Sequence, residues 1–217
     1  MAALRLLSIC SGAAVVTLGM ASGALAEGGE DIANAVMINA LPYMDTGDTS
    51  DNINDYDEVC PYSGSTAPDV VYSYTPAADE SIIIDLCESG YDTKLYVYDN
   101  PNPPGGVFVA CNDDACSDSQ GNPFRSQLVG VALSAGTTYY IVVDGYGGSS
   151  GFYDLIIEPL TTGACCFPDG SCIETDNATC TGSGGEFQGD GTTCDEVVCV
   201  PCVECEDTEG EPICGPD

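Results

Sequence analysis

The amino-acid sequence predicts an all-β protein with two parts, an antiparallel β-sandwich and a small disulfide-rich module. Between residues 70 and 157, short runs rich in β-branched and aromatic residues alternate with Gly, Pro, Asp and Asn, and no convincing helix separates them. From residue 163 to 199 the chain instead places six cysteines in a stretch with almost no aliphatic residues. A parallel α/β fold would need helical crossovers, which this sequence lacks.

The first 26 residues have the features of a signal peptide and are not counted as part of the fold. Arg5 is their lone charge, an apolar run extends from Ala13 to Met20, and Ala24-Leu25-Ala26 forms a small-residue cleavage site. The apolar run is shorter than the roughly 20 residues that span a membrane. We expect a secreted or cell-surface protein without a membrane span, in which residues 27–43 lead into the sandwich.

The charge balance excludes several classes of partner and reaction. Once Arg5 is removed, only Lys94 and Arg125 oppose 35 acidic residues. Nucleic acids and anionic membranes need basic patches, so neither is an expected partner. The chain has no histidine, which excludes Ser-His-Asp and Cys-His catalysis and a histidine-based zinc site. An acidic surface supplies oxygen ligands for hard cations. The alternative is adaptation to salty or calcium-rich surroundings without a discrete site.

The expected strands follow one another with short turns. The segment Asp45–Glu58 holds six acids and two asparagines, so no regular element is expected there. Within Lys94–Tyr98, Leu95 and Val97 can face a core while the tyrosines face the other side. We interpret the tyrosines of the chain as core and cross-strand residues; a ligand platform is the alternative. The strands are expected at 70–75, 81–86, 94–98, 107–109, 127–133, 138–143 and 152–157.

Four segments of this region carry a family resemblance. They read DTKLYVYD (92–99), ACNDD (110–114), GTTYYIVVDGY (136–146) and SGFYDLIIE (150–158). Their order resembles the bacterial pre-peptidase C-terminal domain, a small non-catalytic jelly roll attached to secreted enzymes and surface proteins. The resemblance implies a jelly-roll sandwich over residues 44–159 that acts as an accessory or adhesion module. Its partner would be an extracellular protein or polysaccharide.

The same resemblance implies a calcium site. The aspartates of its DT and NDD segments lie on neighbouring loops at one end of the sandwich, and the matching positions here are Asp92, Asn112, Asp113 and Asp114. Calcium takes six to eight oxygen ligands in flexible geometry, which such a loop helps to supply. The alternative is that Asp92 and Asn112 only cap turns through backbone hydrogen bonds.

The cysteine-rich part, residues 163–199, resembles small modules of large secreted bacterial proteins, of the form GACC-x-PDG-x-C followed by GGxxxGDGTxC. Residues 200–217 resemble the opening of a further module, and the odd cysteine among Cys202, Cys205 and Cys214 leads us to expect a longer natural chain. The spacing of Cys199, Cys202 and Cys205 also suggests zinc, but the acidic flanks and the expected export favour disulfides.

Two disulfides are expected in the sandwich. Cys111 and Cys116 flank a four-residue loop that a disulfide could close, which leaves Cys60 to pair with Cys87.

No catalytic site is expected. Gly147-Gly148-Ser149-Ser150-Gly151 matches the GxSxG pattern, but a nucleophile elbow needs a following helix, and a strand is expected there. The sequence therefore predicts a non-catalytic secreted or cell-surface module, with calcium as a candidate ligand. The alternatives are sugar binding by the sandwich and an N-terminal accessory region of a secreted hydrolase whose catalytic domain lies beyond residue 217.

Overall fold

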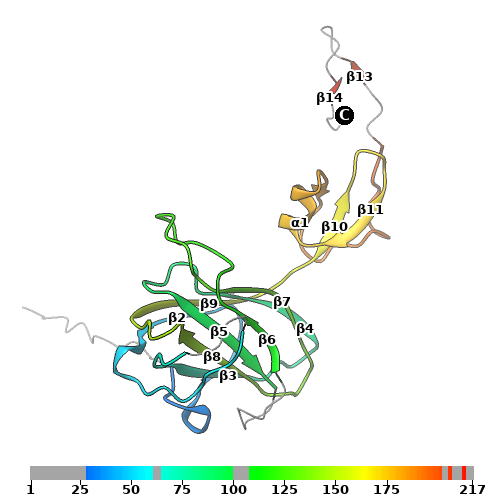
Figure 1. The fold of residues 1–217 in the computed structure, drawn as a ribbon. Coiled ribbons are helices and arrows are strands. Elements are labelled where there is room, and N and C mark those ends of the chain that lie inside the picture. The colour runs from blue at the N-terminus through cyan, green and yellow to red at the C-terminus, as the bar shows by residue number, and fades with distance from the viewer. Residues whose placement is uncertain (1–27, 61–64, 100–107, 202–204, 207–211, 214–217) are drawn as a thin grey trace, which may run out of the picture.

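The computed structural model describes residues 28–60, 65–99 and 108–201, and the backbone of two further short strands at 205–206 and 212–213. The expected signal peptide lies outside these residues. The structure is nearly all-β, with two sheets forming a β-sandwich and a disulfide-rich module following them, as the sequence predicts (Figure 1).

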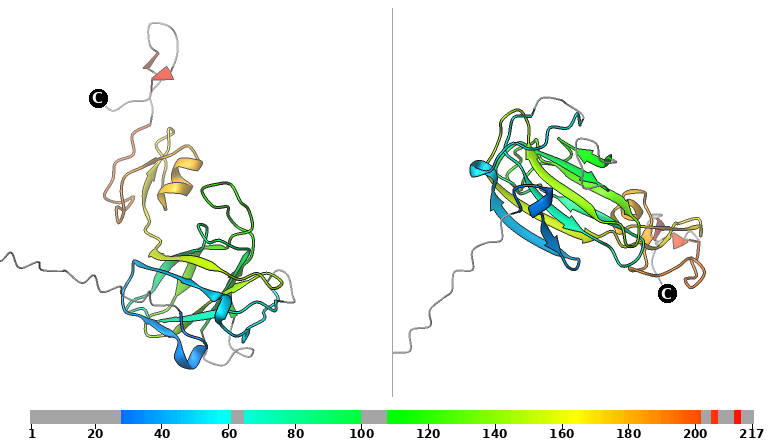
Figure 2. Two further views of the ribbon diagram at one scale, coloured as in Figure 1. Left: turned by 90° about the vertical axis from the view of Figure 1, so that its left-hand side faces the viewer. Right: turned by 90° about the horizontal axis from the view of Figure 1, so that it is seen from below.

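Nine strands form the sandwich in two facing sheets. The first sheet has the order β1-β3-β8-β5-β6, and the second has the order β2-β9-β4-β7. Figure 2 shows the two layers of strands from two further directions. The strands are β1 (Val36–Ile38), β2 (Tyr43–Asp48), β3 (Val70–Tyr74), β4 (Glu80–Asp85), β5 (Thr93–Tyr98), β6 (Phe108–Asn112), β7 (Gln127–Leu133), β8 (Tyr139–Gly145) and β9 (Phe152–Pro159).

The seven strands expected from residue 70 onward are all present, each within a few residues of its predicted position. The expectation of no regular element in Asp45–Glu58 is wrong at its start, because β2 and a 3-10 turn, η2 (Thr49–Asp51), occupy it. A second 3-10 turn, η1 (Ile32–Asn34), precedes β1. Strand β1 pairs in parallel with β3, and every other pairing in the sandwich is antiparallel.

A tyrosine–aspartate network explains why an acidic segment forms β2. Asp45 Oδ2 accepts hydrogen bonds from the hydroxyls of Tyr43 at 3.1 Å and Tyr72 at 3.0 Å. The Tyr72 and Tyr153 hydroxyls lie 2.7 Å apart, and the amide of Gly28 donates to Tyr153 Oη at 2.9 Å. The polar atoms are thus satisfied inside the sandwich, so the aspartate does not oppose strand formation.

The core confirms the expected alternation in β5. Leu95 and Val97 belong to the main cluster between the two sheets. Tyr96 and Tyr98 face the other side, where they pack with Cys60, and both tyrosines are fully buried. Tyr56 of the acidic segment packs against the same cluster, so this segment covers part of the outer face of the sheet. The interpretation of these tyrosines as core residues is confirmed.

The disulfides of the sandwich differ from the prediction. Cys60 pairs with Cys111, and Cys87 pairs with Cys116. Cys111 is the cross-strand partner of Tyr96 and shares the outer cluster that contains Cys60. Cys116 lies beyond the turn and pairs through its backbone with Arg125, close to the end of β4. The two cysteines of the loop therefore bond to different parts of the chain instead of to each other.

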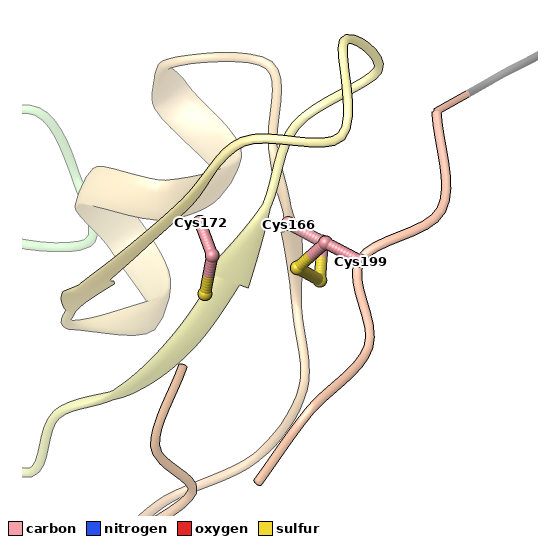
Figure 3. Close-up of side chains that lie close together, drawn as sticks. All are labelled: Cys166, Cys172 and Cys199. Carbon is pink, nitrogen blue, oxygen red and sulfur yellow. A yellow bond between two sulfur atoms is a disulfide. The ribbon is translucent and has the colours of Figure 1, made fainter. Parts of the chain in front are cut away.

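The cysteine-rich module consists of a small sheet and one short helix. The sheet order is β11 (Cys172–Thr175), β10 (Gly163–Cys166) and β12 (Glu186–Phe187), with α1 (Asn177–Gly182) between β11 and β12. Two cysteines of β10 and one of β11 each form a disulfide with a cysteine further along the chain. Figure 3 shows the side chains of Cys166, Cys172 and Cys199. The pairs are Cys165–Cys180, Cys166–Cys199 and Cys172–Cys194. Beyond the module, β13 (Cys205–Glu206) pairs with β14 (Pro212–Ile213).

Candidate functional site

The predicted acidic residues gather where β5 begins and β6 ends. Asp92 directly precedes β5, and Asp113 and Asp114 directly follow β6. These strands are antiparallel neighbours, so the start of one lies beside the end of the other. Carboxylate oxygens from Asp92, Asp113 and Asp114 all lie within 4.8 Å of one another. The structure therefore brings together three of the four predicted residues through their side chains.

Among the described residues, the carboxylate of Asp113 is buried without partners, and that of Asp92 is half-buried with one unpartnered oxygen. Asp113 is 1% exposed, and neither of its carboxylate oxygens has a hydrogen-bond partner within the described part of the chain. Oδ1 of Asp92 is likewise buried and unpartnered there. Burial and then the negative charge of Asp114 raise the pKa of Asp113 to about 6. The positive charge of the nearby Lys94 lowers this pKa but does not offset the rise. The pKa of Asp92 is raised by the same two causes. A buried carboxylate without a partner is unfavourable, and a cation would remove this penalty.

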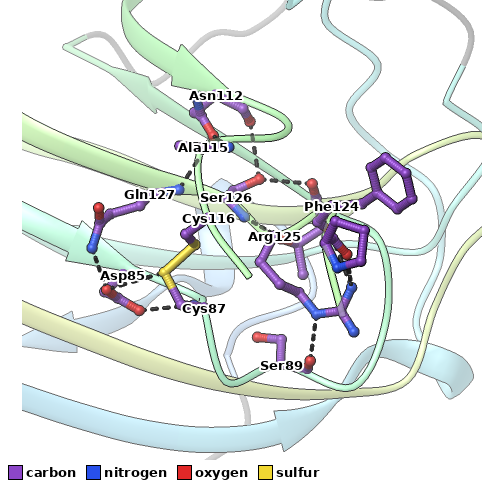
Figure 4. The surroundings of a disulfide bond; sticks show 12 residues. Asp85, Cys87, Ser89, Asn112, Ala115, Cys116, Phe124, Arg125, Ser126 and Gln127 are labelled. Atoms are coloured by element: carbon purple, nitrogen blue, oxygen red, sulfur yellow. Dashed lines mark hydrogen bonds between the residues drawn. A yellow bond between two sulfur atoms is a disulfide. The ribbon is translucent and has the colours of Figure 1, made fainter. Parts of the chain in front are cut away.

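Asn112, the fourth predicted residue, holds the turn that presents the aspartates. Its Oδ1 accepts hydrogen bonds from the backbone amides of Ala115 at 3.0 Å and Gln127 at 3.2 Å (Figure 4). The hydroxyl of Ser126 lies 3.0 Å from the carbonyl oxygen of Asp113. This part of the alternative, a turn held by backbone hydrogen bonds, describes Asn112. The same alternative assigned a turn cap to Asp92, whose Oδ1 accepts no hydrogen bond within the described residues.

The disulfides tie the loops of the site to their neighbours. Cys87 follows β4 on the loop that carries Asp92, and Cys116 follows the turn that carries Asp113. Figure 4 shows this disulfide beside the turn. The bond Cys87–Cys116 thus links the two segments that supply the carboxylates.

The two described cations are both buried at this end of the sandwich. The Nζ of Lys94 donates to the carbonyl oxygen of Glu58 at 3.0 Å. The Nε of Arg125 donates to the carbonyl oxygen of Ser89 at 2.6 Å, and its guanidinium lies 3.9 Å from Asp118. Neither therefore offers an exposed positive charge to an anionic ligand.

Sequence reasoning missed two further buried aspartates. Asp144 accepts hydrogen bonds from Tyr96 Oη at 2.8 Å and Ser65 Oγ at 3.0 Å, and burial raises its pKa to about 6. Asp69 accepts amide hydrogen bonds on Oδ2 from Asp55 at 2.9 Å and Tyr56 at 3.0 Å. Its Oδ1 is unpartnered, and burial raises its pKa to about 8. For Asp144, the sequence offered one signal, since this acid directly follows the apolar run Tyr139–Val143.

The GxSxG segment is a turn, as predicted. The amides of Gly148 and Ser149 both donate to the carbonyl oxygen of Tyr146, and β9 follows at Phe152. The expected strand, rather than a helix, therefore comes after the serine. Of the cysteines considered for zinc, Cys199 is in a disulfide. The side chains of Cys202 and Cys205 lie outside the described residues.

Comparison with known proteins adds little to this geometry. No family model matches the chain, and no curated protein matches it. Among solved structures, one similar chain is the pre-peptidase C-terminal domain of a collagenase from Bacillus anthracis. It is 19% identical, with a TM-score of 0.35, over 57% of this chain and 93% of that chain. These values do not place the chain in that family. Within the described residues, no helix is long and apolar enough to cross a membrane.

Proposed function

We propose that this chain is a non-catalytic accessory module of an exported protein, and that its sandwich binds Ca²⁺ through Asp92, Asp113 and Asp114. The observation that carries the proposal is the Asp113 side chain, buried with two unpartnered oxygens beside two other carboxylates. Three carboxylates supply hard oxygen ligands, and Ca²⁺ completes its shell with carbonyl oxygens or water.

The non-catalytic part of the proposal is supported by the chemistry that the chain carries. The sequence has no histidine, and the one serine motif stands on a hairpin turn. Ten cysteines of the described residues form five disulfides, which leaves none of these ten as a free thiol nucleophile. Disulfides persist in oxidising compartments outside the cytoplasm, which supports export.

Thermal unfolding with and without Ca²⁺ tests this function. A ligand that binds only the folded state at 100 times its Kd stabilises it by about 2.7 kcal/mol. For a chain of this size that is a rise in Tm of roughly 5–10 °C. Asp113→Asn should lose the response, and Asp190→Asn, which changes an exposed acid on the module, should keep it. An equal rise with NaCl at matched ionic strength would indicate charge screening instead and would refute the site.

A further inference from the structure

Two disulfides of the cysteine-rich module lie against each other. The Sγ atoms of Cys166, Cys172 and Cys199 all lie within 4.8 Å of one another (Figure 3). Cys166 is bonded to Cys199, and Cys172 is bonded to Cys194. A sulfur of one disulfide therefore stands next to both sulfurs of the other.

The backbone allows a different pairing of these cysteines. Cys166 and Cys172 are directly opposite each other on the antiparallel strands β10 and β11. Opposite residues of such a pair have Cα atoms about 4.5–5.5 Å apart, which falls within the range that a disulfide spans. A Cys166–Cys172 bond therefore needs no rearrangement of the sheet.

Access separates these four cysteines from the third pair of the module. Cys166, Cys172, Cys194 and Cys199 are all partly exposed. Cys165 and Cys180 are fully buried. Successive residues of a strand point to opposite faces, so Cys165 lies on the other side of β10 from Cys166. Thiol–disulfide exchange depends on access to the attacked sulfur, so the exposed pairs are the reactive ones.

We propose that Cys166, Cys172, Cys194 and Cys199 form a thiol–disulfide exchange site. The co-reactant is a thiolate, from a small thiol or from a cysteine of another chain. It attacks Cys194 Sγ, forms a mixed disulfide there and releases Cys172 as a thiolate. Cys172 then attacks Cys166 Sγ, so that the Cys166–Cys172 bond forms and Cys199 leaves with the electron pair.

The sequence of steps closes without net oxidation or reduction. The Cys199 thiolate attacks Cys194 in the mixed disulfide, forms Cys194–Cys199 and returns the original thiolate. If the mixed disulfide is with another protein and this last step does not occur, the module stays covalently joined to that protein through Cys194. The site would therefore serve either disulfide isomerisation or covalent capture of a thiol-bearing partner.

Single cysteine variants of the full chain test the exchange. In Cys199→Ser, Cys166 loses its partner and carries a free thiol. If this thiol attacks Cys172, the Cys166–Cys172 bond forms and the free thiol is then on Cys194. The free thiols are alkylated, the disulfides are then reduced and alkylated with a second reagent, and peptide mass spectrometry locates the first label. We expect the first label on Cys194 to be several-fold above its level in the unsubstituted chain. First label on Cys166 alone would overturn the proposal.

The reciprocal variant and a matched control complete the design. In Cys194→Ser the first label should move from Cys172 to Cys199, and label on Cys172 alone would overturn the proposal. In the control Cys180→Ser the label should stay on Cys165, and label spread over the module would show unspecific scrambling and refute a defined site. The unsubstituted chain with a trace of glutathione, which needs no variant to fold, should yield peptides that link Cys166 with Cys172. Their absence after the glutathione has exchanged with Cys194 would also refute the proposal.

Discussion

Replacing the buried Asp69 by asparagine should change how the stability of the protein depends on pH. The Asp69 side chain is fully buried, and burial raises the pKa of its carboxyl from 3.8 to about 8. Between these two values the folded protein holds a proton that the unfolded chain has released. Stability therefore falls as pH rises through this window, because the unfolded state binds fewer protons there.

The structure sets the size of this effect. One proton corresponds to about 1.4 kcal/mol of unfolding free energy per pH unit. From pH 5 to pH 7, Asp69 therefore contributes a loss of roughly 2–3 kcal/mol, and the loss ends above its pKa of about 8. Asparagine keeps an oxygen for the two backbone amides that bond to Oδ2 but cannot titrate. The free energy of unfolding of the Asp69→Asn variant should therefore fall less steeply between pH 5 and pH 7 than that of the unsubstituted protein.

Urea unfolding at pH 5, 6, 7 and 8, at constant ionic strength and with a calcium chelator, measures the difference. The other carboxyls whose pKa is raised, those of Asp92, Asp113, Asp144 and Asp154, are present in both proteins, and of these only Asp144 interacts electrostatically with Asp69. Asp190→Asn changes an exposed acid and should follow the unsubstituted protein. If Asp69→Asn and the unsubstituted protein gave parallel curves, Asp69 would not carry the proton assigned to it.

Three other predictions follow from the same structure. Joint replacement of Cys87 and Cys116 by serine should weaken Ca²⁺ binding at least several-fold, because their disulfide links the loops of the site. The far-ultraviolet circular dichroism spectrum should stay unchanged, and an unchanged affinity would contradict the prediction. Ca²⁺ affinity should fall as pH drops below about 6, where Asp113 takes up a proton, and a titration flat from pH 7 to 5 would argue against that carboxylate as a ligand. Gly47→Ala should destabilise the fold by about 1–3 kcal/mol in urea unfolding, because the added Cβ would clash with the Tyr153 ring, and unchanged stability would show that the ring can move.

The strands were predictable because their residues act locally. Runs such as Lys94–Tyr98 and Tyr139–Val143 combine β-branched and aromatic side chains with nearby turn formers, and both are strands in the structure. Strand β2 was missed because its stability depends on distant residues. Asp45 is accommodated by Tyr72, which lies 27 positions further along the chain. Composition alone counted that aspartate as a turn former.

The disulfides of the sandwich were mispredicted for a related reason. A short loop between Cys111 and Cys116 suggests closure, but the direction of each side chain decides the partner. Cys111 is in β6 and faces the outer cluster with Cys60, whereas Cys116 lies past the turn near Cys87. These directions depend on the strand register, which the spacing of cysteines does not contain.

The carboxylates were predictable as a group, but their separate roles were not. The adjacency of Asp92 to Asp113 and Asp114 follows from the pairing of β5 with β6. The sequence pattern predicted Asn112 as a metal ligand together with the neighbouring aspartates. In the structure its Oδ1 instead accepts hydrogen bonds from two backbone amides. Asp113 is buried while the adjacent Asp114 is exposed, a difference that two consecutive aspartates in a sequence do not reveal.

Isothermal titration of the full chain with Ca²⁺ tests the central claim most directly. The account predicts one saturable site per chain, with an affinity that falls at least tenfold in Asp113→Asn and is unchanged in Asp190→Asn. The absence of saturable binding, or equal affinity in the unsubstituted chain and Asp113→Asn, would contradict it.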